Sequence, residues 1–163
     1  MKTIGYATAV LVLLMAGCAV ERFPGQLITV DLRNAKATPV AAETGTRTID
    51  EQAALQLLTT EDKQLLAAIR ATEKEQGFGS ASWSVVDGAL RYESFRLGQP
   101  SEKSSQIWLQ VNWHEHTIQL FATEKVERIG LVATSLSQEI HKTGLDANVT
   151  VVENSVPVRP GIF

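Results

Sequence analysis

Two histidines in the segment His114-Glu115-His116 are the residues of this chain best suited to hold a metal ion. Neutral imidazole is a common ligand of zinc and other transition metals, and residues i and i+2 of a regular strand point to the same face. The third histidine, His141, lies far along the chain, and nothing in the sequence brings it close. The segment therefore has two alternative interpretations: a metal or small-ligand site on His114 and His116, or a polar turn.

No set of residues predicts a catalytic site. Ser80, Ser82 and Ser84 alternate with other residues, as on the solvent face of a strand, and none stands in a nucleophile-elbow sequence. The segment Gly77-Phe78-Gly79 follows a predicted helix, whereas a dinucleotide-binding loop follows a strand and opens a helix. The sequence therefore predicts a protein that is not an enzyme and has no cofactor.

Two tryptophans, Trp108 and Trp113, are candidate binding residues on one predicted strand. Trp113 shares the odd-numbered face of that strand with three aliphatic residues, Ile107, Leu109 and Val111. Because strand side chains alternate, Trp113 is expected in the core and Trp108 on the opposite face. An exposed tryptophan on a sheet is a typical binding hot spot. The alternative is that a loop or the C-terminal tail covers Trp108.

The only cysteine of the chain, Cys18, ends the segment Leu13-Leu14-Met15-Ala16-Gly17-Cys18. Lys2 and the apolar run Ile4–Ala16 precede it, which is the layout of an export signal. The segment resembles the lipobox of bacterial lipoproteins, with Met15 where the family usually has Leu. The resemblance implies that residues 1–17 are a signal peptide and that Cys18 carries a diacylglyceryl thioether and an N-acyl chain such as palmitate.

Lipidation of Cys18 predicts a membrane anchor. Each buried methylene contributes about 0.8 kcal/mol, so two or three chains hold a protein on a bilayer. A spanning helix needs about 20 apolar residues, and charged Glu21 and Arg22 interrupt the run first. Plain secretion would leave a free thiol in an oxidising compartment. In the lipoprotein family, Asp directly after the cysteine tends to retain the protein at the inner membrane. This chain has Ala19 at that position. The resemblance therefore implies the outer membrane, with the domain facing the periplasm.

The charge of the chain limits its partners. It has 15 basic and 18 acidic side chains, and loss of Lys2 with the signal changes the net charge from −3 to −4. An acidic domain is a poor partner for nucleic acid, and its charge argues against binding of anionic lipid through a polybasic segment. The expected partners are the membrane, through the anchor on Cys18, and another envelope protein.

Composition shifts divide the chain after the signal peptide into three parts. Residues 18–48 are expected to hold the lipidated cysteine and a tether or loop, residues 49–155 an α+β domain, and residues 156–163 an extended tail. Alternation over residues 27–32 predicts a strand. Residues 34–48 are rich in Ala, Thr, Pro and Gly without a period, as in a loop. Whether the strand joins the core sheet stays open.

Helical signals flank a segment rich in strand patterns. A helix is predicted over 61–76, and the short segment 51–58 either joins it or is separated from it at the threonines. A second helix is predicted from Thr123 through Lys142, with a final strand at 149–152. Within 81–122, the apolar residues change from odd to even positions between Trp113 and Thr117. A turn there gives a four-strand meander, and a bulge gives two long strands.

The predicted fold is α+β, an antiparallel sheet with two main helices packed on one face. If the 27–32 strand belongs to the sheet and 81–122 is one long hairpin, the order becomes ferredoxin-like, β-α-β-β-α-β. The leading functional hypothesis is a non-catalytic, lipid-anchored envelope protein whose domain binds another envelope component through a sheet face or edge near Trp108. The alternative is a small-ligand or metal-binding lipoprotein that uses His114 and His116.

Overall fold

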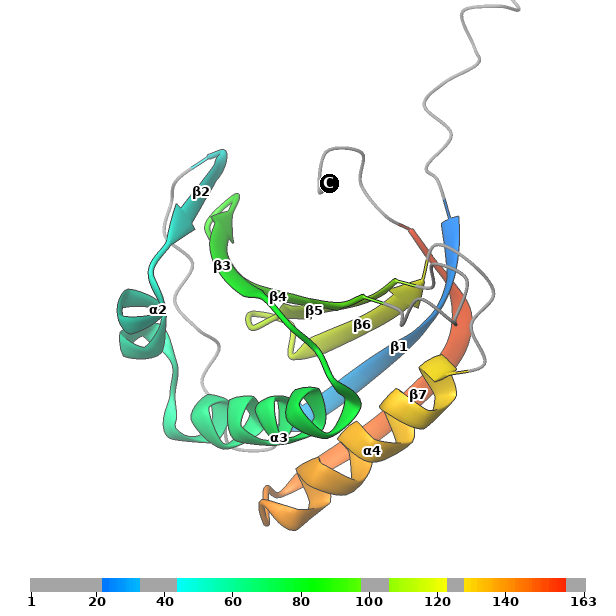
Figure 1. Ribbon diagram of the computed structural model, residues 1–163. Coiled ribbons are helices and arrows are strands. Elements are labelled where there is room, and N and C mark those ends of the chain that lie inside the picture. The colour runs from blue at the N-terminus through cyan, green and yellow to red at the C-terminus, as the bar shows by residue number, and fades with distance from the viewer. Residues whose placement is uncertain (1–21, 33–43, 98–105, 123–127, 158–163) are drawn as a thin grey trace, which may run out of the picture.

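The computed structural model describes residues 22–32, 44–97, 106–122 and 128–157 (Figure 1). Cys18 and the proposed signal peptide lie outside these ranges. The described residues form seven strands and three helices, in the order β1 (Arg22–Leu32), β2 (Thr46–Ile49), α2 (Glu51–Leu57), α3 (Thr60–Gln76), β3 (Ala81–Val86), β4 (Ala89–Arg96), β5 (Ile107–Asn112), β6 (Thr117–Ala122), α4 (Arg128–Lys142) and β7 (Ala147–Pro157).

All seven described strands form one antiparallel sheet, in the neighbour order β2-β3-β4-β5-β6-β1-β7. Figure 1 shows α3 and α4 along one side of this sheet, and α2 beside the end formed by β2 and β3. The prediction of an α+β fold with an antiparallel sheet is therefore confirmed. None of the helices in the described ranges is long and apolar enough to cross a bilayer.

β1 is an interior strand of the sheet. It pairs with β6 on one side and along its whole length with β7 on the other, from Arg22 opposite Pro157 to Leu32 opposite Ala147. The sequence places only residues 27–32 in a strand and assigns the rest of 18–48 to a tether or loop. In the structure β1 already starts at Arg22, and β7 continues to Pro157, into the segment predicted as a tail.

The segment 81–122 forms four strands, so the turn alternative is correct. Asp87 and Gly88 have φ of 48° and 80° in the β3–β4 hairpin, because a tight turn of this type needs positive φ at both central residues. The chain turns again at residues 113–116, where His116 has φ of 49°. With four strands here and β2 before α2, the element order differs from the ferredoxin-like one.

Local capping signals separate α2 from α3. Thr59 is the N-cap of α3: its hydroxyl accepts from the Asp62 N–H at 3.1 Å, and the Asp62 carboxylate accepts from the Thr59 N–H at 3.0 Å. This reciprocal capping box satisfies two backbone donors that the first turn leaves without partners. Gly77 ends α3 with φ of 74°, which glycine adopts without strain. Of the two alternatives for residues 51–58, separation from the following helix at the threonines is therefore correct.

The hydrophobic core lies between the sheet and the pair α3 and α4. Its members come from every layer of the fold, and several are fully buried, including Ile28, Leu65, Ile69, Leu109, Trp113 and Leu136. Burial of one such side chain contributes about 1.5–3 kcal/mol relative to exposure. The opposite face of the sheet carries none of the described helices. It is called the open face below.

The capping box gives a stability prediction. Thr59→Ala removes the hydroxyl acceptor and is expected to lower the free energy of unfolding by about 1 kcal/mol. The matched control is Thr60→Ala, because Thr60 is an exposed neighbour in the first turn of α3. Urea titration followed by circular dichroism measures both. Equal effects of the two substitutions would contradict the capping role of Thr59.

Candidate functional site

Three aromatic side chains stand side by side at the centre of the open face. Phe95 of β4, Trp108 of β5 and Phe121 of β6 are directly opposed in the strand register. The Trp108 and Phe121 rings stack at a centroid distance of 5.5 Å and an interplanar angle of 7°. Phe121 is fully buried, whereas Trp108 is half-buried. The stack therefore holds the Trp108 ring in place while leaving part of it exposed, which suits contact with a partner.

A row of polar side chains adjoins this aromatic row. Glu93, Gln110 and Gln119 are opposed on the same three strands, two residues along from the aromatic rings. Gln110 Nε2 donates to Glu93 Oε1 at 3.0 Å. Burial raises the pKa of the Glu93 carboxyl, although the nearby Arg91 and the bond from Gln110 act in the opposite direction. Within the described residues, Arg91 Nε is buried and has no hydrogen-bond partner.

The open face can therefore make two kinds of contact. An apolar or planar group can stack on Trp108, and polar groups can bond to Glu93 and its neighbours. Such a mixed surface typically gives both affinity and orientation in protein recognition.

Trp113 lies on the other side of the sheet, in the core. It is fully buried and stacks on Trp83, with ring centroids 5.8 Å apart, and Trp83 in turn meets the edge of Tyr92 at 4.7 Å. A partner at the protein surface has no access to Trp113. Of the two tryptophans singled out in the sequence, only Trp108 is placed to take part in binding.

The two histidines of the β5–β6 turn have different surroundings. His116 Nε2 lies 2.9 Å from Oδ1 of Asp62, whose carboxylate is fully buried at the start of α3. His114 is exposed. In the described parts of the chain, no three His, Cys, Asp or Glu residues are grouped to hold a metal ion. A metal on His116 would have to compete with a bond that ties this turn to α3.

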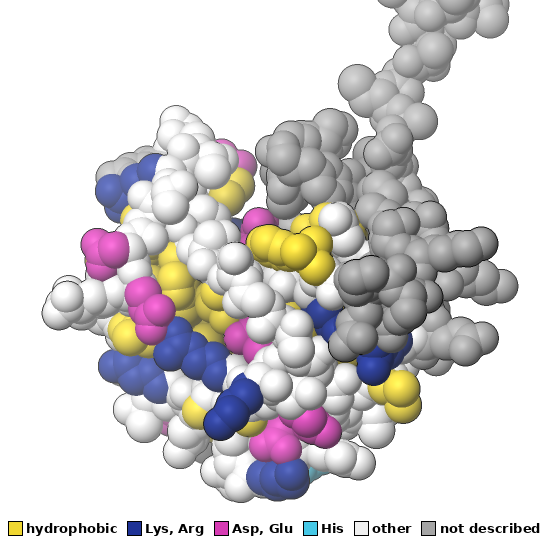
Figure 2. All heavy atoms as spheres, viewed as in Figure 1, with side chains coloured by type: hydrophobic (Ala, Val, Ile, Leu, Met, Phe, Trp, Pro, Cys, Tyr) yellow, Lys and Arg dark blue, Asp and Glu magenta, His cyan; other side chains and the backbone are white. Residues whose placement is uncertain are grey.

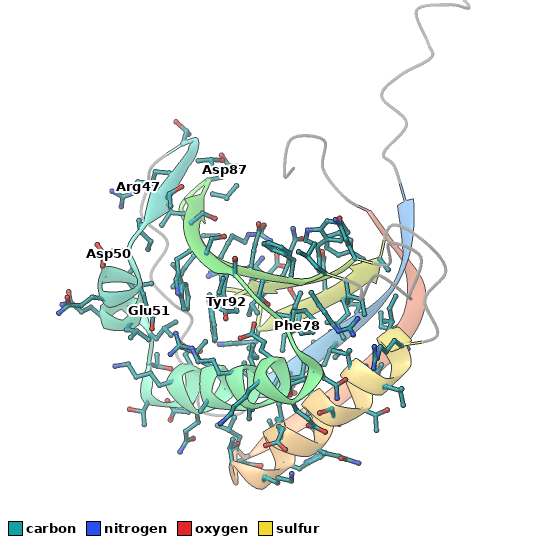
Figure 3. All side chains as sticks on the ribbon, viewed as in Figure 1. Arg47, Asp50, Glu51, Phe78, Asp87 and Tyr92 are labelled. Atoms are coloured by element: carbon teal, nitrogen blue, oxygen red, sulfur yellow. The ribbon has the colours of Figure 1, made fainter. Side chains whose placement is uncertain are left out.

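A polar cluster between α3 and β4 was not found from the sequence. The Tyr92 hydroxyl donates to both carboxylate oxygens of Glu73, at 2.9 and 2.8 Å, and the Ser94 hydroxyl donates to the same carboxylate. Figure 3 shows Tyr92 in the space between the sheet and α3. Burial raises the pKa of the Glu73 carboxyl, against the effect of its bonds and of Arg70, and burial also raises the pKa of Tyr92.

Helical spacing contains the signal for this cluster. Glu73 lies four residues after Ile69 and eight after Leu65, so it continues their buried stripe. Tyr92 and Ser94 share the strand face of Leu90, which packs toward the helices. The cluster joins α3 to β4, and its donors and acceptor satisfy one another. We assign it to the support of the sheet.

The Glu73 carboxyl gives a pH prediction. A carboxyl whose pKa is raised by folding adds stability below the unfolded value, about 4.3, and loses it as the pH rises through the folded value. Glu73→Gln removes this titration. The free energy of unfolding of the variant relative to wild type should therefore increase from pH 4 to pH 7. Glu61→Gln is the control, and a pH-independent difference for Glu73→Gln would contradict the burial argument.

Asp62 titrates in the opposite sense. Burial acts to raise its pKa, but the bonds from His116 and Thr59 outweigh burial, and the net effect lowers the pKa. Asp62 therefore adds stability above its unfolded value, about 3.9, and the stability is lost as the pH falls through the folded value. Asp62→Asn should cost about 1–3 kcal/mol at pH 7 and less below pH 4. Asp31→Asn, at an exposed position, is the control; a constant loss at all pH values would argue against ionised Asp62.

Comparison with known proteins gives no matching family model, no similar curated protein and no similar solved structure.

Proposed function

We propose that this chain is a lipid-anchored protein of the cell envelope whose open face binds another envelope component without catalysis. The anchor is Cys18, and the location is the outer membrane on its periplasmic side. The single observation that carries the binding role is the half-buried Trp108, held by its stack on Phe121 on a face without a described helix.

The position of β1 defines how close the sheet would lie to the proposed anchor. Only residues 19–21 separate Cys18 from Arg22, where the sheet begins. Four Cα–Cα steps reach at most about 15 Å. The start of β1, and with it the end of β7 opposite, would therefore lie next to the bilayer that holds the acyl chains.

The chemistry of the open face supports a protein partner. A partner side chain on Trp108 would gain from burial of apolar area, while Glu93 and Gln110 would orient polar groups beside it. Figure 2 shows Lys and Arg side chains interspersed with Asp and Glu over α2 and α3. Among the described side chains in this view there is no single positive patch for the phosphates of a nucleic acid.

The anchor is tested by metabolic labelling with an alkyne analogue of palmitate. The wild-type chain should take up label, and Cys18→Ala should take up none, because the chain has no other cysteine. A radiolabelled amino acid measures the amount of each protein as a control. An intact mass that shows unmodified Cys18 in the mature chain would contradict the anchor.

The binding face is tested by crosslinking in intact cells, followed by purification of the chain and its crosslinked partner. Trp108→Ala should lower the yield of the partner strongly, since loss of a hot spot of about 2 kcal/mol weakens binding about 30-fold. Leu57→Ala is the matched control, because Leu57 is an exposed hydrophobic residue on α2 (42% exposed) away from this face. Circular dichroism confirms that both variants fold. Recovery of the same partner by Trp108→Ala and wild type would overturn the proposal.

A further inference from the structure

β7 is a long strand at the edge of the sheet. It covers eleven residues, Ala147–Pro157, and among the described strands it pairs only with β1. Among the described residues, its outer edge has no strand partner and presents a row of backbone N–H and C=O groups. An edge of this length is a template for pairing with another strand.

The exposed hydrophobic residues gather at this edge. Among the described residues, three of the five large exposed hydrophobic side chains lie here: Leu131 on α4 (63% exposed) and Val151 and Val152 on β7 (42% and 40%). A groove of about 530 Å³ runs between α4 and β7, and Leu131 and Val151 line it together with uncharged residues only. The groove carries no charged side chain, and its lining mixes apolar residues with uncharged polar ones.

The sequence of β7 lacks the usual protection of an edge strand. It contains no lysine or arginine, and Glu153 is its only charged residue. Natural edge strands commonly carry inward-facing charge, lysine or a central proline that prevents pairing. The one proline, Pro157, stands at the very end of the strand.

We propose that β7 pairs with β7 of a second copy of this chain, antiparallel and about a two-fold axis at Val152. The axis is perpendicular to the sheet, so the two sheets become one continuous sheet. This inference does not depend on the proposed function, because it uses the backbone edge of β7 rather than Cys18 or the open face.

Strand geometry fixes where the axis can lie. Directly opposed residues of antiparallel strands point to the same face, and a perpendicular two-fold axis keeps each face on its own side. The axis must therefore lie between the two copies of one residue, so that this residue is paired with itself. Val152 is the middle residue of Ala147–Pro157, so an axis there opposes Ala147 to Pro157 and leaves no residue of either strand without a partner.

The same symmetry would bring the groove of each copy next to the shared edge. α4 contacts β1, β6 and β7 on one face of the sheet, so the two copies of α4 lie on the same face of the joined sheet. The groove of each copy then borders the shared edge, and Leu131 and Val151 are partly covered. One charged residue per strand, Glu153, lies opposite Val151 rather than opposite itself in this register. No like charges face each other along the pair.

Cysteine crosslinking in the full chain tests the pairing. At the axis the two Val152 positions have Cα atoms about 4.5–5.5 Å apart, within the range that a disulfide spans. Val152→Cys is expressed in the full chain, the purified chain is treated with copper phenanthroline, and non-reducing electrophoresis measures the covalent dimer. The unaltered chain, with Cys18 as its only cysteine, gives the background.

Two matched variants give the comparison. Leu57→Cys places a thiol at a similarly exposed site away from the edge (42% against 40%). Thr150→Cys places one on the same strand and face, but four residues separate the two copies of position 150, about 13 Å, too far for a disulfide. We expect at least about five-fold more dimer from Val152→Cys than from either variant. Dimer at the level of Leu57→Cys, or equal dimer from Thr150→Cys, would overturn the pairing.

Discussion

The antiparallel pairing of β1 with both β6 and β7 is the interaction on which the rest of the structure depends. Through β6, β1 joins the four-strand meander, and through β7 it joins the C-terminal strand that follows α4. Ile28 and Val30 of this strand are almost fully buried against the helices. Loss of β1 would leave β7 without its only described neighbour and open the core beneath α4. β1 therefore holds both ends of the domain in one sheet.

The two faces of the sheet differ because strand side chains alternate. On β5, Leu109 and Val111 face the helices, whereas Trp108 and Gln110 face the opposite side. A shift of one residue in the register would exchange these sets, exposing the aliphatic residues and burying polar ones. The core thus fixes the register of β5 so strongly that the position of Trp108 on the open face follows from it.

Local signals in the sequence predict where helices start and end and where a hairpin turns. Thr59 and Asp62 start α3, Gly77 ends it, and Asp87-Gly88 forms the predicted hairpin, because each acts within a few residues. The change of parity after Trp113 requires either a turn or a bulge before Thr117, and the structure has the turn. Pairing between distant segments leaves no such signal. The full length of β1, the strand β2 and the bond between His116 and Asp62 all depend on residues far apart in the chain.

The proposed anchor and the proposed pairing of β7, taken together, would constrain the orientation of the domain on a membrane. Antiparallel pairing of β7 would place the two starts of β1 at opposite ends of the shared edge, since Arg22 lies opposite Pro157 in each copy. Only residues 19–21 separate Cys18 from Arg22, so two lipidated cysteines would reach one bilayer only if the strands lay along it. The two-fold axis would then be normal to the bilayer, and one face of the sheet would be turned toward lipid. For the open face to receive the proposed partner, α3 and α4 would have to be the elements that face the membrane.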